Sequence, residues 1–128
     1  MQIEKRNGSY EVFLPEKITS AMHKAFIAAG QPVDETVLTN LTQAVSEAIS
    51  QDQDAKIDLK VERVQDLVEE ILMKNAHYKV AKIYILYRSQ RQALRYLRHN
   101  IIRQLNYPGL EKRLESIQNT YQEAAYSF

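Results

Sequence analysis

Apolar positions recur at helical spacing over most of this chain, but the first 13 residues follow a different pattern. Two short runs, Ile3–Arg6 and Ser9–Phe13, flank the dipeptide Asn7-Gly8. Asn-Gly is the strongest two-residue signal for a type I′ turn, because both of its positions need a positive φ. The N-terminus is therefore predicted to form a β-hairpin.

From Pro15 the apolar residues recur at i, i+3, i+4 and i+7, which places them on one face of an α-helix. Gly30 suits the left-handed residue that ends such a helix. A second helix is predicted from Asp34, its N-cap, to Ser50, and a third begins after Lys60. The apolar stripes of these three helices are Ile18, Ala21, Met22, Ala25 and Phe26; Val37, Leu41, Ala44, Val45, Ala48 and Ile49; and Val61, Val64, Val68, Ile71 and Leu72.

Residues 51–56 are predicted as a polar loop, and residues 57–59 are a candidate for a short third strand against the hairpin. Residues 76–104 keep a helical pattern without Gly or Pro, and would span roughly 42 Å at 1.5 Å per residue. Tyr107-Pro108-Gly109 marks a turn before a final helix that starts near Leu110. The apolar line of the long helix is Val80, Ile83, Tyr87, Leu94, Leu97 and Ile101.

These elements predict an α+β fold that is mainly α: a small helical bundle with an N-terminal β-hairpin and a C-terminal helical extension. We expect residues 1–90 to form one domain and residues 91–128 to be an extension or linker towards a further domain. The 128 residues contain no cysteine, which excludes a disulfide, a thiolate zinc site and a cysteine nucleophile. No apolar run resembles a signal peptide or a membrane span, so a cytoplasmic location without membrane partners is expected.

The formal charge of +1 hides an uneven distribution. Residues 44–75 carry eight acids against four bases, and residues 78–104 carry seven bases and no acid. Arg88, Arg91, Arg95 and Arg98 are spaced so that all four lie on one side of the long helix. This stripe could contact phosphates or an acidic protein surface, or it could pair with Glu111 and Glu115 of the last helix. The acidic third helix and the basic fourth helix also offer complementary surfaces for self-association.

Side chains that could carry catalysis are poorly arranged in this sequence. The three histidines lie far apart, and neither a metal-ligand spacing nor a nucleophile motif is present, so an enzyme active site is not expected. The three glycines cannot build a phosphate-binding loop. A nucleotide would need side-chain cations, and Lys5, Arg6 and Lys17 could gather around a polyphosphate. Physical reasoning alone favours the alternative that they are solvated surface charges.

The order of three motifs nevertheless resembles the ATP-cone domain. Lys5-Arg6-Asn7-Gly8 followed by Phe13-x-x-x-Lys17-Ile18 is similar to the opening of that family, although its commoner residue at position 7 is Asp. Residues 61–69 and 77–88 resemble its second and third signatures, except that Lys60 stands where many members have Ser or Thr. The resemblance implies binding of ATP or dATP as allosteric effectors, usually with Mg²⁺.

The resemblance also implies roles for individual residues. Lys5, Arg6 and Lys17 would hold the phosphates and their metal, and Asn7 would keep the turn between them. Residues 11–14 would border the adenine, with Glu11 accepting from its amino group and Ile18 packing on the base. The remaining expected contacts are Val12, Phe13 and Leu14 at the base, Val61 and Gln65 near the sugar, and Arg88 or Arg91 at the phosphates.

The sequence therefore predicts a non-catalytic, adenine-nucleotide-sensing regulatory domain from a ribonucleotide reductase large subunit. Its partners would be adenine nucleotides and reductase subunits or a second copy, with activity controlled through subunit association. One alternative is the ATP-cone module of a nucleotide-responsive transcriptional regulator, whose zinc ribbon needs cysteines, and nucleic acid is accordingly not an expected partner. The other alternative is a helical interaction module that binds no nucleotide.

Overall fold

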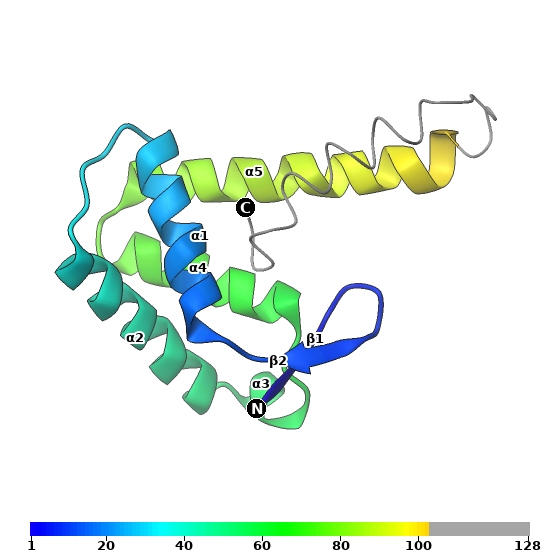
Figure 1. The fold of residues 1–128 in the computed structure, drawn as a ribbon, viewed down its shortest axis with the longest axis horizontal. Helices are drawn as coiled ribbons and strands as arrows, with labels where there is room; N and C mark the ends of the chain where they lie inside the picture. The colour runs from blue at the N-terminus through cyan, green and yellow to red at the C-terminus, as the bar shows by residue number, and fades with distance from the viewer. Residues whose placement is uncertain (103–128) are drawn as a thin grey trace.

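The computed structural model describes residues 1–102 of the chain, and these residues are mainly helical with an N-terminal hairpin, as predicted (Figure 1). The predicted turn at residues 107–109, the final helix and its Glu111 and Glu115 lie outside the described residues. The elements are β1 (Gln2–Glu4), β2 (Tyr10–Val12), α1 (Pro15–Ala28), α2 (Glu35–Gln51), α3 (Gln53–Ile57), α4 (Val61–Lys74), α5 (Tyr78–Tyr96) and a π-helical segment η1 (Leu97–Ile102).

The two strands form an antiparallel hairpin in which Ile3 pairs with Glu11. The predicted type I′ turn is wrong, because Gly8 has a positive φ of 87° whereas Asn7 does not. Lys5 accepts from Gly8 N–H at 3.0 Å and donates to the Ser9 carbonyl at 2.7 Å, which closes a three-residue loop around Arg6. The Asn7 side chain accepts from Ser9 N–H at 3.0 Å and stabilises that wider loop.

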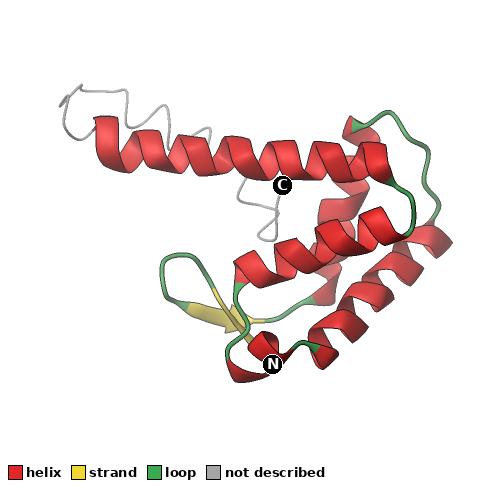
Figure 2. Cartoon of the chain, turned by 180° about the vertical axis from the view of Figure 1, so that it is seen from behind, coloured by secondary structure: helices red, strands yellow, loops and turns green. Residues whose placement is uncertain are grey.

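The core lies between α1, α2, α4 and α5, and the predicted apolar stripes supply most of it. Every predicted stripe residue of α1 is buried. In α2 the buried face is rotated slightly, so that Leu38 is buried and Val37 only half-buried. Ile3 of β1 is fully buried in the same core and anchors the hairpin to the helices. The hairpin thus lies beside the start of α4 and faces the far half of α5 (Figure 2).

Two helices end in the same backbone motif. Gln31 N–H donates to the Phe26 carbonyl after α1, and His77 N–H donates to the Leu72 carbonyl after α4. The left-handed residue is Gly30 in the first motif, as predicted, but Ala76 with a φ of 62° in the second. The prediction that the long helix starts at residue 76 is wrong for this reason, and α5 begins at Tyr78.

The segment between α2 and α4 differs from the prediction in two ways. Residues 51–56 are not a loop, because Asp52 accepts from Ala55 N–H at 3.0 Å and caps the short helix α3. Ile57 is the last residue of α3 and 87% exposed, so the candidate third strand is reduced to a single bridge between Glu4 and Lys60. Lys60 makes no side-chain cap for α4, in agreement with its unusual residue type for that position.

Helix α5 packs on α1 and α4, and its far end extends past both, above the hairpin loop (Figure 1). Its predicted apolar line is buried only at Val80, whereas Leu94 is half-buried and Leu97 exposed. The residues that α5 buries are Val80, Ala81, Tyr84 and Arg91. A buried arginine beyond the last buried apolar residue shows that the far end of α5 borders a polar site.

Candidate functional site

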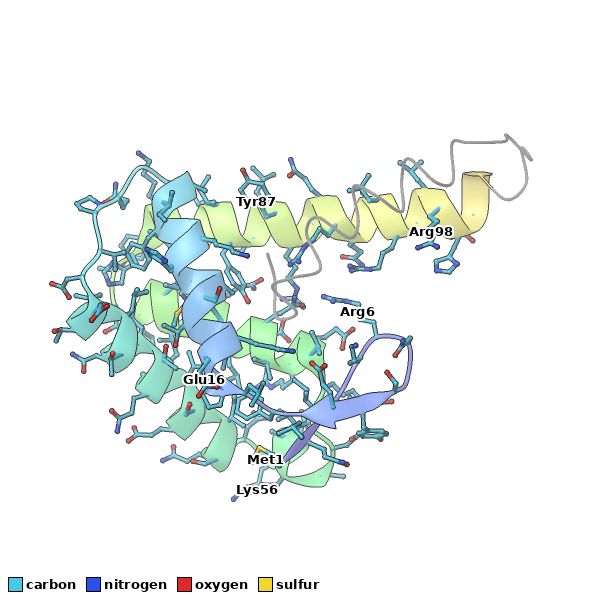
Figure 3. The ribbon with its side chains drawn as sticks, viewed as in Figure 1. Met1, Arg6, Glu16, Lys56, Tyr87 and Arg98 are labelled. Atoms are coloured by element: carbon cyan, nitrogen blue, oxygen red, sulfur yellow. The ribbon has the colours of Figure 1, made fainter. Side chains whose placement is uncertain are left out.

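A cavity of about 760 Å³ lies between the hairpin and α5. Figure 3 shows Arg6 rising from the hairpin loop towards α5, with Arg98 further along that helix. Three segments line the cavity, namely the strands and their loop with the first turn of α1, the start of α4, and the far half of α5 with η1. The lining residues are Lys5, Arg6, Asn7, Glu11, Lys17, Val61, Glu62, Arg88, Arg91, Gln92, Arg95, Tyr96, His99 and Asn100.

Six of these side chains are Lys or Arg and two are Glu, so the cavity concentrates positive charge in a chain whose formal charge is +1. The cations come from separate segments: Lys5 and Arg6 from the hairpin, Lys17 from α1, and three arginines from α5. Like charges brought together repel one another unless an anion lies between them. The arrangement is therefore suited to a ligand with several negative charges.

Arg6 is held by α4. Its Nη2 donates to Gln65 Oε1 at 2.7 Å, and its Nε lies 3.4 Å from Glu62 Oε1. Burial lowers the pKa of Arg6 below its ordinary value, the neighbouring Arg88 lowers it further, and Glu62 partly offsets both. The Arg6 guanidinium is thus held in the cavity, and the negative charge of Glu62 does not fully offset the cost of burying it.

Glu11 lies between the two lysines at the other side of the cavity. Its Oε1 is 3.2 Å from Lys17 Nζ and its Oε2 is 3.7 Å from Lys5 Nζ. One carboxylate therefore bridges the hairpin and the first turn of α1. A phosphate arriving at these lysines would compete with Glu11 for them.

Arg88 and Arg91, either of which the sequence allows as a phosphate contact, have different surroundings. Arg88 donates to Asp66 at 2.7 Å and to Glu69 at 2.9 Å, and although burial opposes its charge, these carboxylates raise its pKa overall. Arg91 is only 7% exposed, and burial, followed by the charge of Arg6, lowers its pKa to about 10. Arg91 is the stronger candidate for an anion contact, because carboxylates already balance the charge of Arg88.

These Arg88 contacts also bear on the acidic and basic helices. Asp66 and Glu69 of α4 face α5 within one chain, so part of the complementary surface expected to drive self-association is used internally. Arg95 lines the cavity, and its pKa is lowered by burial and by the charge of Arg6. Arg98, the fourth member of the stripe, does not line it.

The structure brings eight of the predicted site residues together around the cavity: Lys5, Arg6, Asn7, Glu11, Lys17, Val61, Arg88 and Arg91. It does not bring in Val12, which is 61% exposed, nor Phe13, Leu14 and Ile18. Ile18 is fully buried in the core, and Gln65 is buried directly behind Arg6. Glu62, from the first turn of α4, also lines the cavity and was not predicted. Gln92, Tyr96, His99 and Asn100 were not predicted either, and they line it because the chain stays helical beyond the last family-like motif.

Within residues 1–102, no helix is long and apolar enough to cross a membrane. In the same residues, no three acidic, histidine or cysteine side chains are grouped as metal ligands would be.

Comparison with known proteins gives concordant results. The model of the ATP cone domain family matches residues 1–93. The ribonucleoside-diphosphate reductase subunit alpha of Chlamydia trachomatis serovar D is 38% identical over 105 residues, which cover 74% of this chain and 10% of that protein. The corresponding subunit of Treponema pallidum is 35% identical over 104 residues, covering 79% and 12%. The vitamin B12-dependent ribonucleoside-diphosphate reductase of Thermoplasma acidophilum is 33% identical over 99 residues, covering 73% and 12%. The chain thus spans about a tenth of the length of these relatives.

Proposed function

This chain belongs to the ATP-cone domain family, and from that premise we propose that its cavity binds an adenine nucleoside triphosphate as an allosteric effector. The observation that carries the proposal is the convergence on one cavity of six cationic side chains from the hairpin, α1 and α5. A triphosphate supplies the multiple negative charge that such a cluster lacks. Mg²⁺ would accompany the phosphates, since the described residues offer no ligand set of their own.

The phosphates are assigned to Lys5, Arg6, Lys17 and Arg91. Arg91 is chosen over Arg88 because its charge is the less compensated of the two. For the adenine we retain residues 11–14 and Ile18 as candidate contacts. Among them only Glu11 lines the cavity, so the base would lie at the edge where Glu11 meets the two lysines.

At the level of the whole protein, the chain is proposed to be a regulatory, non-catalytic part of a cytoplasmic ribonucleotide reductase large subunit. The support is the similarity to reductase subunits over a region that is about a tenth of their length. ATP and dATP would share the cavity and favour different arrangements of its walls. Each nucleotide can shift that equilibrium only by its difference in affinity for the two arrangements. The expected output is a change in subunit association.

Calorimetry on the isolated chain with ATP, dATP and GTP tests the binding site. We expect heat with both adenine nucleotides and much less in the Lys5→Ala/Lys17→Ala variant. The matched control is Lys56→Ala/Lys82→Ala, which removes the same charge from exposed lysines that do not line the cavity. Figure 3 shows Lys56 well away from Arg6. No heat from the native chain with either adenine nucleotide would refute the proposed function.

Sedimentation of the full-length reductase that carries this chain tests the regulatory output. We expect dATP to change the sedimentation coefficient more than ATP does. Identical sedimentation with the two nucleotides would remove subunit association from the proposal while leaving nucleotide binding intact.

A further inference from the structure

One buried polar side chain connects the core of α4 to the cavity. Gln65 has no exposed surface and lies on the helix between Val64 and Leu67, which are both buried in the core. Apart from Gln65 and Arg91, the buried side chains of the described residues are hydrophobic. An amide in such surroundings is stable only where a hydrogen bond replaces its lost water.

That hydrogen bond comes from the hairpin loop. Arg6 Nη2 donates to Gln65 Oε1 at 2.7 Å, across a sequence separation of 59 residues. A guanidinium has donors but no acceptor, so the amide oxygen of Gln65 must face Arg6. Gln65 Nε2 is buried, with no hydrogen-bond partner among the residues that the structure describes. The side chain is therefore oriented by Arg6 rather than by its own surroundings.

Arg6 needs such a restraint. It belongs to a three-residue loop at the tip of the hairpin and shares the cavity with Arg91 and Arg95, which repel it. Water lies on its open side, since 27% of its side chain is exposed. Without a contact on α4, repulsion and solvation would both favour rotation of the guanidinium out of the cavity.

The chemical type of the restraint matters as much as its place. The two carboxylates on Arg88 fix that arginine and also balance its charge. An amide fixes Arg6 through a short hydrogen bond and leaves its charge in place, because the amide is neutral. Glu62 also approaches Arg6, but at 3.4 Å and with 47% of its side chain exposed, so water screens its charge.

From these contacts we infer that Gln65 is a positioning residue, which holds the Arg6 guanidinium in the cavity with its charge available to a phosphate. The inference rests on the proposed function and changes the role that the sequence suggests for Gln65. Gln65 acts through Arg6 and need not touch the sugar.

The test is a double-mutant cycle between the two residues, read by calorimetry with inorganic tripolyphosphate and with ATP. Gln65→Met keeps the length and volume of the side chain and removes its acceptor. It should weaken binding of both probes by about tenfold, the effect of one charge-assisted hydrogen bond. In the Arg6→Gln background the same substitution should change binding less than twofold. Gln65→Glu should also weaken both probes, because its carboxylate retains the contact but balances the charge of Arg6.

Val68→Ala is the control for a merely structural effect, because Val68 is fully buried on the same helix and does not line the cavity. We expect it to lower the thermal midpoint of the chain and to leave the affinity of both probes unchanged. A change in stability alone thus cannot imitate the predicted pattern.

The outcomes that overturn the inference are distinct from those that overturn the proposed function. Native affinity in Gln65→Met, or an equal loss with and without Arg6, would show that Gln65 does not act through Arg6. A loss confined to ATP would assign Gln65 to the sugar or the base. A native chain that binds ATP but not tripolyphosphate would also refute the inference, because the charge of Arg6 would then not hold the ligand. Failure of the native chain to bind ATP refutes the proposed function itself.

Discussion

Replacement of Arg91 by Met should make the ligand-free chain more stable and its ligand binding weaker. Arg91 is 7% exposed, and its pKa falls from its ordinary value to about 10, chiefly through burial and then through the charge of Arg6. Methionine has a similar length, no charge, and enough flexibility to fill an irregular space. The substitution removes the cost of burying this charge, together with the anion contact that the charge is proposed to make.

The size of the effect follows from the pKa. The fall of the Arg91 pKa from its ordinary value to about 10 corresponds to about 3 kcal/mol at 1.36 kcal/mol per pKa unit. This is an upper value, because methionine also loses the polar contacts of the guanidinium. We therefore expect the free energy of unfolding without ligand to rise by about 1 to 2 kcal/mol at neutral pH.

The sign of the pH dependence is opposite to that of an ordinary ion pair. A cation whose pKa is lower in the folded than in the unfolded chain destabilises the fold wherever both forms are charged, which includes neutral pH. That penalty begins to fall as the pH rises past about 10, the pKa of folded Arg91, and is lost only at the higher pH where the unfolded chain also loses this proton. The advantage of Arg91→Met should accordingly be constant near neutrality and shrink in strongly alkaline buffer.

Urea unfolding of both chains, with and without ATP, is the assay. Added sodium chloride should stabilise the native chain more than the variant, since salt screens repulsion among the cavity cations. ATP at about 100 times its Kd should stabilise the native chain by roughly 2.7 kcal/mol, and the variant by less at the same concentration. If the variant without ligand is less stable than the native chain, this prediction is wrong, because Arg91 would then be net stabilising.

Four further substitutions test other parts of the structure. Glu11→Gln should tighten binding of tripolyphosphate by roughly two- to tenfold in calorimetry, because it removes the carboxylate that pairs with Lys5 and Lys17. Weaker binding of tripolyphosphate would contradict this prediction. A loss of affinity for ATP alone would support a contact between Glu11 and the adenine. Ala76→Gly should raise the free energy of unfolding by about 1 kcal/mol, because Ala76 has a φ of 62°, which glycine adopts more readily. Gly30→Ala should lower it by a similar amount, because Gly30 has a φ of 67°; the added Cβ would meet no other atom, so the effect would come from the backbone alone. Asp52→Asn should lower the urea midpoint of unfolding at neutral pH, because the hydrogen bond from Arg63 lowers the pKa of Asp52. The loss of stability should be complete above pH 3.8, the ordinary pKa of Asp, and should shrink as the pH falls below that value. A loss that does not change with pH would assign the effect to the helix cap alone.

Helical periodicity allowed most of this fold to be predicted. The stripe of α1 and the Asp34 cap of α2 are confirmed because both depend on neighbours three or four residues away. The turn that follows β1 and the boundary between α4 and α5 were predicted less well. The hairpin turn depends on the φ of Asn7, and the start of α5 depends on Ala76 adopting a conformation that its residue type disfavours.

The candidate site could be predicted only in part. The cations were identified individually, but their grouping depends on packing between segments that are distant in sequence. Arg88 and Arg91 are three positions apart, which is about 60° around a helix, and only the packing of α4 shows which of them carboxylates balance. Nothing in the sequence shows that Gln65 faces Arg6, since hydrophobic residues surround it on its helix.

Helix α5 has the geometry of a lever. Its first half rests on α1 and α4, and the half beyond Arg88 forms one wall of the cavity. From Arg88 to the end of η1 at Ile102, the helical segment extends about 20 Å. A tilt of about 5° around Arg88 would displace Ile102 by roughly 2 Å over that length. A small difference in how a ligand fits between the hairpin and α5 would thus be amplified along the chain, away from the core that holds the fold together.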